Sequence, residues 1–149
     1  MMLRRFLLVA LTAFSIIAVA CSGGGDIEPA EDYESLSAAL EAAGMNVGDP
    51  VENKFLFSNL FSVPGVIMTA SGQELLAFEF GTPEEAAEQA DLVSEDGYGI
   101  GAKYINWIED PQFFLNGRMI VVYDGAQSLV IETLVAAMGE QFVDPSGGL

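Results

Sequence analysis

Apolar residues at the start of the folded part follow the spacing of a helix. Tyr33, Leu36, Leu40 and Ala43 fall on one helical stripe. Gly44 comes directly after this stripe, where a left-handed residue commonly ends a helix. The pattern therefore predicts a first helix that begins near Tyr33.

Two further helices are predicted from their start signals and apolar period. Thr82 offers a capping hydroxyl, Pro83 suits the first helical position, and Glu85 can close a capping box. A third helix is predicted over about 126–138, where apolar residues again recur with the helical period.

Between the first two helices the apolar period changes to two, which predicts a hairpin. Residues 66–69 form its first strand, and Ser71-Gly72 supplies the turn. In the second strand, Leu76, Phe78 and Phe80 alternate with smaller or charged residues. We expect this strand to have one buried face and one partly exposed face.

A second group of strands is predicted before the third helix. Residues 113–115 and 118–123 flank Asn116-Gly117, which is a strong signal for a tight hairpin turn. Residues 103–108 are predicted as a strand that ends before a proline. Residues 54–61 are a candidate for one further strand.

The order is therefore helix, two strands, helix, two or three strands, helix. Connections within each strand group are too short for parallel crossovers, so we expect an antiparallel sheet. Helices packed on one face of such a sheet make an α+β domain. We predict an α+β fold, with an antiparallel sheet of about four to five strands and three helices, over residues 33–143. Residues 144–149 are expected to form a flexible tail.

The amino terminus has the three-part plan of a secretory signal peptide. A short positive start at residues 1–5 precedes fifteen uncharged residues, 6–20, which end in the small residues Ala18-Val19-Ala20. As a helix, fifteen residues span about 22 Å, less than the roughly 30 Å of a hydrocarbon core. We therefore expect residues 1–20 to be removed rather than to stay as a membrane span.

Cys21, the single cysteine of the chain, follows directly. The segment Ala18-Val19-Ala20-Cys21 resembles a bacterial lipoprotein signal peptide, although Ala18 stands where such sequences usually carry leucine. The resemblance implies that the thiol is lipidated and that the chain is cut just before it. It also implies several acyl chains on Cys21, which firm anchoring needs, because one chain binds a membrane only marginally. The alternative is a secreted protein with a free amino-terminal cysteine.

Residues 21–32 read as a glycine, serine and acidic tether. The rest of the mature chain is similar to small bacterial envelope lipoproteins in phrases such as those at 61–65 and 116–121. This resemblance implies a lipid-anchored location on the extracytoplasmic side of the cell membrane or the outer membrane. It implies no activity.

The charge of the chain limits its ligands. It has 22 acidic and 5 basic residues, no histidine and a net charge of −17. Removal of residues 1–20 would leave Lys54, Lys103 and Arg118 as the basic residues, too few for a nucleic-acid site. Without histidine, the chain lacks the usual general base and the commonest metal ligand. One cysteine excludes an internal disulfide and a cysteine-rich zinc site.

Two sequence patterns are candidates for chemistry. Residues 97–102 match the glycine spacing of a dinucleotide site, but a helix precedes them and a strand follows, so a mobile glycine loop is favoured. Glu95-Asp96 and Glu109-Asp110 are carboxylate pairs that could serve glycoside hydrolysis or calcium binding. Their spacing is unspecific, so solvated loop acids are favoured. We expect no cofactor and no metal site.

The aromatic-rich stretch before the last hairpin has two interpretations. Tyr104, Trp107 and Phe113 are candidate partner-binding residues, because tyrosine and tryptophan dominate interface hot spots. Such rings also carry large apolar areas that are commonly buried in a core.

These observations favour a non-enzymatic, membrane-anchored lipoprotein that binds another envelope macromolecule. One alternative is an inhibitor of a basic cell-wall hydrolase, because opposite charges steer association. A second is a small-molecule binder with a pocket between sheet and helices, lined by Phe78, Tyr104 and Trp107. The third is a small hydrolase that uses the carboxylates at 95–96 or 109–110.

Overall fold

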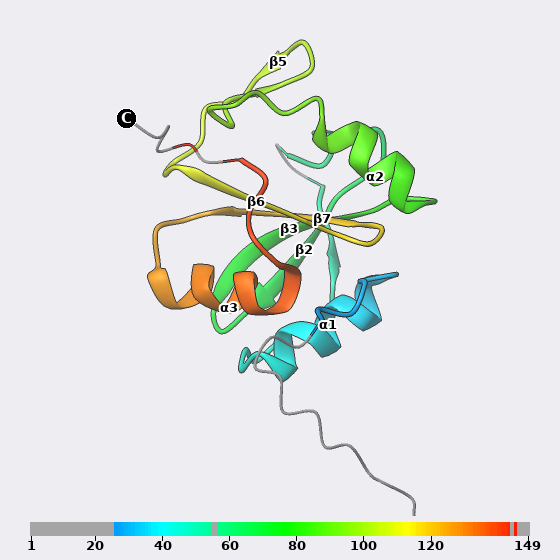
Figure 1. Ribbon diagram of the computed structural model, residues 1–149. Coiled ribbons are helices and arrows are strands. Elements are labelled where there is room, and N and C mark those ends of the chain that lie inside the picture. Colours follow the sequence, from blue (N-terminus) through cyan, green and yellow to red (C-terminus); the bar gives the residue numbers. More distant parts are fainter. Residues whose placement is uncertain (1–25, 55–56, 144, 146–149) are drawn as a thin grey trace, which may run out of the picture.

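Helices and strands follow one another in nearly the order that the apolar patterns predict. The computed structural model describes residues 26–54, 57–143 and 145; the predicted signal peptide and Cys21 lie outside them. The elements of the described residues are α1 (Tyr33–Ala42), β1 (Val51–Glu52), β2 (Val66–Ala70), β3 (Gln73–Glu79), α2 (Pro83–Ala90), β4 (Gly99–Ile100), β5 (Lys103–Tyr104), β6 (Pro111–Asn116), β7 (Met119–Asp124) and α3 (Ser128–Met138). Five of the strands form an antiparallel sheet in the order β1-β2-β3-β7-β6, and β4 and β5 form a separate hairpin (Figure 1). The predicted α+β class is confirmed.

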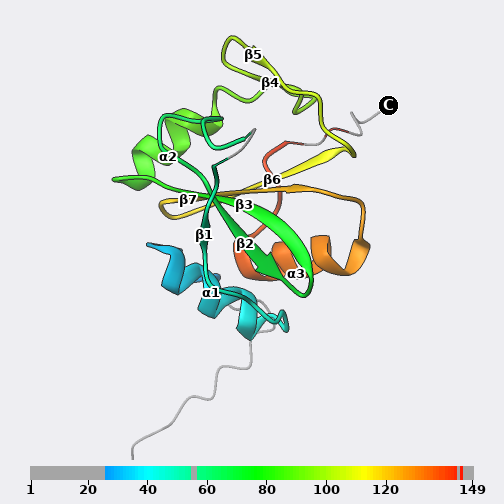
Figure 2. The same ribbon diagram turned by 180° about the vertical axis from the view of Figure 1, so that it is seen from behind.

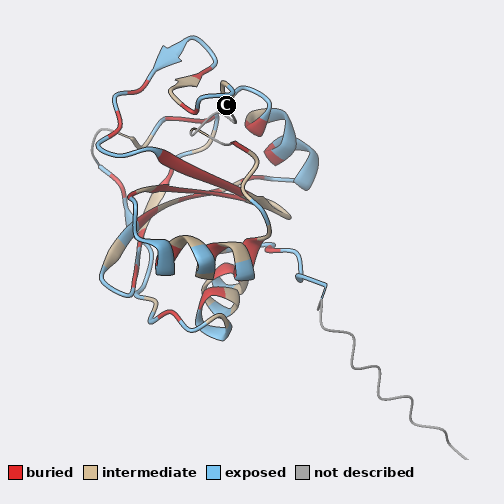
Figure 3. Ribbon diagram, turned by 60° about the vertical axis from the view of Figure 1, so that its left-hand side comes forward, coloured by how far each residue is buried: buried red, intermediate tan, exposed pale blue. Residues whose placement is uncertain are grey.

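The sheet is covered on both faces. Strand β7 is buried from Met119 to Tyr123, and its side chains alternate between two hydrophobic clusters. Val121 packs in the cluster that contains α1 and α3, whereas Val122 packs in the cluster that contains α2. Figure 3 shows the central strands as buried between helices whose outer faces are exposed. The expectation that all helices cover one face is therefore wrong.

Strand β3 shows the same two-sided burial. Phe78 and Phe80 are buried toward α2, as the alternation predicts. The other face is partly exposed at its ends, at Gln73 and Glu79, as predicted, but Leu75 and Ala77 between them are fully buried beneath α1 and α3. Both faces of β3 are covered, because α1 and α3 pack on one face and α2 packs on the other.

Side-chain caps begin the first two helices. The Asp32 carboxylate accepts a hydrogen bond from the Ser35 backbone N–H (2.8 Å), and the Ser35 hydroxyl accepts one from the Asp32 N–H (3.0 Å). At α2, Thr82 Oγ1 accepts from the Glu85 N–H (3.1 Å), as predicted. Glu85 then accepts from the N–H of Gly81 (2.9 Å), so the second bond reaches one residue further back than a capping box requires.

Both predicted tight hairpins form. Ser71 and Gly72 have φ values of 50° and 80°, as a type I′ turn requires. In the β6–β7 hairpin Asn116 pairs with Met119, so the two loop residues are Gly117 and Arg118 rather than the predicted Asn116 and Gly117. Gly117 takes a φ of 55° at the first loop position, where glycine has no steric cost.

The last residues of the predicted tether are bonded to this turn. The Arg118 N–H donates to the Ala30 carbonyl (2.9 Å), and the Asn116 side chain donates to the Glu28 carbonyl (2.9 Å). A side chain at Gly117 would collide with the backbone of Ala30. The domain therefore holds the chain from Glu28 onward, although residues 28–32 are predicted to belong to the tether.

One of the predicted strands does not form in the described residues, and a second forms only at its start. Of residues 103–108, only Lys103–Tyr104 is a strand, and the described part of 54–61 contains none. These segments instead bury rings from irregular backbone: Trp107 stacks on Phe57 with ring centroids 5.1 Å apart and donates its indole N–H to the Gly97 carbonyl (2.9 Å). Figure 2 shows the β4–β5 hairpin on the α2 side of the sheet. No helix of the described residues is long and apolar enough to cross a bilayer.

Packing of α3 on the sheet should carry much of the stability. We expect Leu134→Ala to lower the free energy of unfolding by about 3 kcal/mol, because Leu134 is fully buried and its removal leaves a cavity. Leu129→Ala is the matched control on the same helix, since Leu129 is 76% exposed, and should change it by less than about 0.5 kcal/mol. Urea unfolding followed by circular dichroism measures both, and equal effects would contradict this packing.

Candidate functional site

The three aromatic candidates lie in different environments. Tyr104 is 77% exposed, whereas Trp107 is buried and Phe113 is fully buried. The edge of Phe113 packs against Trp107 with ring centroids 5.9 Å apart. Of the three, only Tyr104 presents its ring to a partner without a change in the fold. The three side chains of the predicted small-molecule pocket do not share one surface, because Phe78 is fully buried and packs against Phe61 (ring centroids 4.9 Å apart), whereas Tyr104 is exposed.

Tyr104 belongs to a small aromatic and acidic arrangement. Its ring stacks with Tyr98 at a centroid distance of 6.3 Å, and the Tyr98 hydroxyl donates to Asp110 Oδ1 (3.0 Å). This bond to a carboxylate raises the pKa of Tyr98 above its ordinary value, because it favours the neutral phenol. Asp96 accepts from the Ser94 hydroxyl (2.5 Å) and from the Tyr98 N–H (3.0 Å), and the Ser94 bond is the main cause of a lowered pKa of Asp96.

The described contacts do not gather the four candidate carboxylates at one site. Asp96 and Asp110 bind different groups of Tyr98, and the backbone N–H of Glu109 donates to Asp124 (2.8 Å). Glu95 lines a groove that does not include the other three. Within the described residues, no three acidic or cysteine side chains are grouped closely enough to hold a metal ion.

The glycine-rich segment 97–102 forms a hairpin. Gly99 pairs with Tyr104 and Ile100 with Lys103, which leaves Gly101 and Ala102 as the turn. Lys103 extends from this hairpin and donates to the Asn59 carbonyl and to the Leu60 carbonyl (3.2 Å). The element that follows this segment directly is strand β5 and not a helix. A helix N-terminus is therefore not available there to bind a pyrophosphate.

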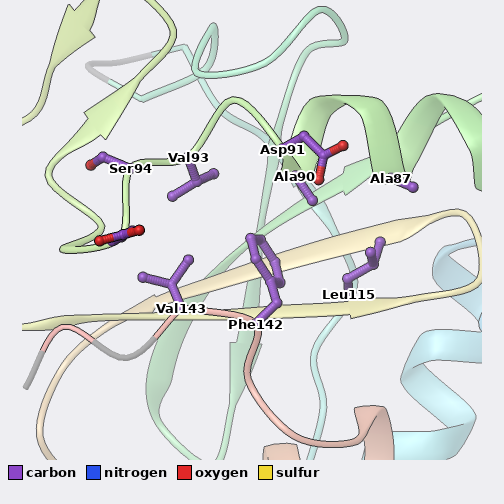
Figure 4. Close-up of a pocket in the computed structure, with 9 residues that line it drawn as sticks. Ala87, Ala90, Asp91, Val93, Ser94, Leu115, Phe142 and Val143 are labelled. Carbon is purple, nitrogen blue, oxygen red and sulfur yellow. The ribbon is translucent and has the colours of Figure 1, made fainter. Parts of the chain in front are cut away.

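A groove of about 580 Å³ lies between α2 and the edge strand β6 (Figure 4). This volume is in the range of roughly 300–1,000 Å³ that is usual for ligand sites. Its lining comes from three separate parts of the chain: Ala87, Ala90, Asp91, Val93, Ser94 and Glu95, then Leu115, and then Phe142 and Val143. No local pattern marks such a set, so the sequence predicts no groove here.

The charged side chains of the groove are acidic. Asp91 is the C-terminal cap of α2, and Glu95 follows in the next loop. No basic residue lies in the last turn of α2 to balance the negative end of its helix dipole. The mouth of the groove is therefore a region of negative potential above an apolar floor.

The described basic side chains are engaged elsewhere. Arg118 pairs with Glu79 (3.0 Å), Lys54 lies 3.6 Å from Glu52, and Lys103 binds backbone carbonyls. Apart from Glu79 and Glu52, the acidic residues of the described surface form no ion pair with a described basic side chain.

Comparisons with protein-family models, with curated proteins and with solved structures find no match to this chain. The chemistry of the groove is therefore argued from its own residues.

The role of the hydrogen bond between Tyr98 and Asp110 can be tested through the pKa of the Tyr98 hydroxyl. We expect Asp110→Asn to lower the pKa of Tyr98 toward about 10, because the variant removes the charge that favours the phenol. Since the folded state raises this pKa, the bond stabilises the fold fully below the pKa of an unfolded tyrosine. Its contribution is lost as pH rises through the raised value.

An NMR titration of ¹³C-labelled tyrosine measures this pKa. Glu109→Gln is the control, because it removes a neighbouring charge while leaving Asp110 in place. A Tyr98 pKa that is the same in Asp110→Asn and in the unaltered chain would disprove the role of this bond.

Proposed function

We propose that this protein is a lipoprotein of the bacterial envelope, anchored through Cys21 on the extracytoplasmic side, and that its domain binds another envelope macromolecule without catalysing a reaction. The observation that carries the proposal is the position of the single cysteine, directly after Ala18-Val19-Ala20 and a signal-peptide pattern.

The number of residues between Cys21 and the first hydrogen bond to the domain supports a domain that is held close to its membrane. Among the described residues, the first hydrogen bond between the tether and the domain is at the Glu28 carbonyl, seven residues after Cys21. Seven residues span at most about 25 Å when fully extended. A lipid on Cys21 would therefore keep the β6–β7 turn within that distance of the anchor, and the domain would meet partners at or near the membrane.

The charge distribution supports a basic protein as the partner. The described lysine and arginine side chains are bound to carbonyls or carboxylates of the domain itself. The surface is thus poorly suited to nucleic acid or to anionic lipid headgroups, which would be repelled. A basic partner would be steered toward it by the long-range field.

The anchor is tested by Cys21→Ser. We expect the unaltered chain to sediment with membranes and the variant to be released, because serine cannot form the thioether link to lipid. Ser22→Ala is the matched control, and it should remain with the membranes. Mass spectrometry of the mature amino terminus should find acyl groups on Cys21, whereas a terminus without acyl groups or a variant that remains membrane-bound would contradict the proposal.

A second candidate function is inhibition of a basic cell-wall hydrolase, favoured by the same excess of carboxylates. We expect the protein to inhibit lysozyme at low ionic strength, with the effect decreasing as salt approaches about 0.15 M, where charges are screened beyond roughly 8 Å. A lysozyme turbidity assay measures this, with an unrelated protein of equal net charge as control. Absence of inhibition at low salt would exclude this function.

A further inference from the structure

The floor of the groove is apolar and is fixed by three elements. Ala90 lies on α2, Leu115 on β6, and Phe142 in the segment after α3. The Phe142 N–H donates to the Phe113 carbonyl (3.1 Å), and the two rings lie 5.8 Å apart. Figure 4 shows the Phe142 ring between Leu115 and Val143, directed toward the α2 side, where Ala90 and Asp91 lie. An occupant would therefore rest on a preformed apolar surface.

The edge of β6 offers backbone hydrogen bonds beside this floor. The Phe113 carbonyl points away from β7, because it accepts the bond from Phe142. Backbone direction alternates along an antiparallel strand, so the N–H and carbonyl of Leu115 point outward as well. No described residue bonds to them. These two backbone groups are therefore available for hydrogen bonds with a ligand that lies beside the floor of the groove.

The charges at the mouth of the groove favour a positively charged group of a ligand. Asp91 and Glu95 are exposed carboxylates, and the negative end of α2 adds to their potential. The Ser94 hydroxyl is already used, since it donates to Asp96 and accepts from the Gly99 N–H (2.7 Å). Lysine and arginine match this arrangement, because their aliphatic stems pack on apolar surface while the charged end stays near acceptors.

We propose that the groove between α2 and β6 binds an extended segment of a partner protein in which apolar residues alternate with lysine or arginine. The proposal rests on the proposed function and specifies its partner. The apolar side chains lie on Leu115 and Phe142, and the basic side chain reaches Asp91 and Glu95. An anionic or wholly apolar ligand fits less well, because it would cover these carboxylates without compensating their lost hydration.

The probe is an acetylated, amidated and fluorescently labelled hexapeptide of alternating leucine and lysine, whose anisotropy is measured against the full chain in nonionic detergent. We expect Asp91→Asn combined with Glu95→Gln to weaken binding at least about tenfold, as loss of close charge pairs does. The matched control is Glu84→Gln combined with Glu88→Gln, which removes two exposed charges of α2 that do not line the groove. It should weaken binding less than about twofold, because exposed, distant charges contribute little.

A second variant tests whether the groove itself must be open for binding, without changing the charge of the protein. Ala87 is exposed on α2 and lines the groove, so Ala87→Leu should fill part of the groove and leave the core intact. We expect it to weaken binding at least about fivefold, while a thermal melt stays close to that of the unaltered chain. Failure of the unaltered chain to bind the peptide would overturn the proposal.

Other occupants give distinct results. Equal weakening by the two carboxylate pairs would indicate diffuse charge attraction, and equal affinity for a leucine–glutamine peptide would indicate an apolar ligand. Self-association in sedimentation velocity that Ala87→Leu abolishes would assign the groove to a second copy. Each of these results overturns the proposal.

Crosslinking in intact cells separates this proposal from the proposed function. A partner that is captured equally by the unaltered chain and by the groove variants would refute the groove while the binding function stands. Absence of any captured partner, together with an unacylated Cys21, would refute the proposed function itself. Capture that is lost in both the Ala87→Leu and the Asp91→Asn/Glu95→Gln variants supports both.

Discussion

The fold depends on the burial of strand β7 on both of its faces. Its neighbours β3 and β6 pair with it along its length, and the side chains from Met119 to Tyr123 are withdrawn from water. A strand of this kind needs an apolar layer on each side, and at roughly 25 cal/mol per Å² such burial is the main stabilising term. Helices α1 and α3 form one layer, and α2 with the loops around Trp107 forms the other.

The second layer explains both the irregular loops and the groove. Helix α2 has two buried alanines, Ala86 and Ala90, so it contributes little apolar volume to its face of the sheet. Side chains from the segments at 57–61, 98–107 and 142–143 add to that volume, and several of them are aromatic rings. Where these rings stop, small side chains of α2 stand above Leu115 and leave an open space beside Phe142. The groove is thus a consequence of covering a broad sheet with a short alanine-rich helix.

Charged side chains contribute little to the core and act mainly at junctions between elements and on the surface. The core contains almost no ionisable groups, and two of the three described basic side chains stabilise a junction: Arg118 holds the β6–β7 turn against β3, and Lys103 holds the β4–β5 hairpin against the loop at 59–60. Most carboxylates remain on the surface, where they oppose compaction slightly but favour encounters with basic surfaces. The proposed site would combine this general attraction with local selectivity, because its acidic side chains lie above an apolar floor.

The sequence by itself determined the features that depend on near neighbours. The stripe ending at Gly44, the cap at Thr82 and the turns at Ser71-Gly72 and Gly117 are set by backbone sterics and by hydrogen bonds over a few residues. They could therefore be predicted, together with the antiparallel α+β class. Only tertiary structure decided that α2 covers the opposite face from α1, that Trp107 is buried in a loop instead of a strand, and that Leu115 and Phe142 meet beside Asp91. These outcomes depend on which segments, distant in the sequence, pack against the same apolar surface. The spacing of residues along the chain does not determine that choice.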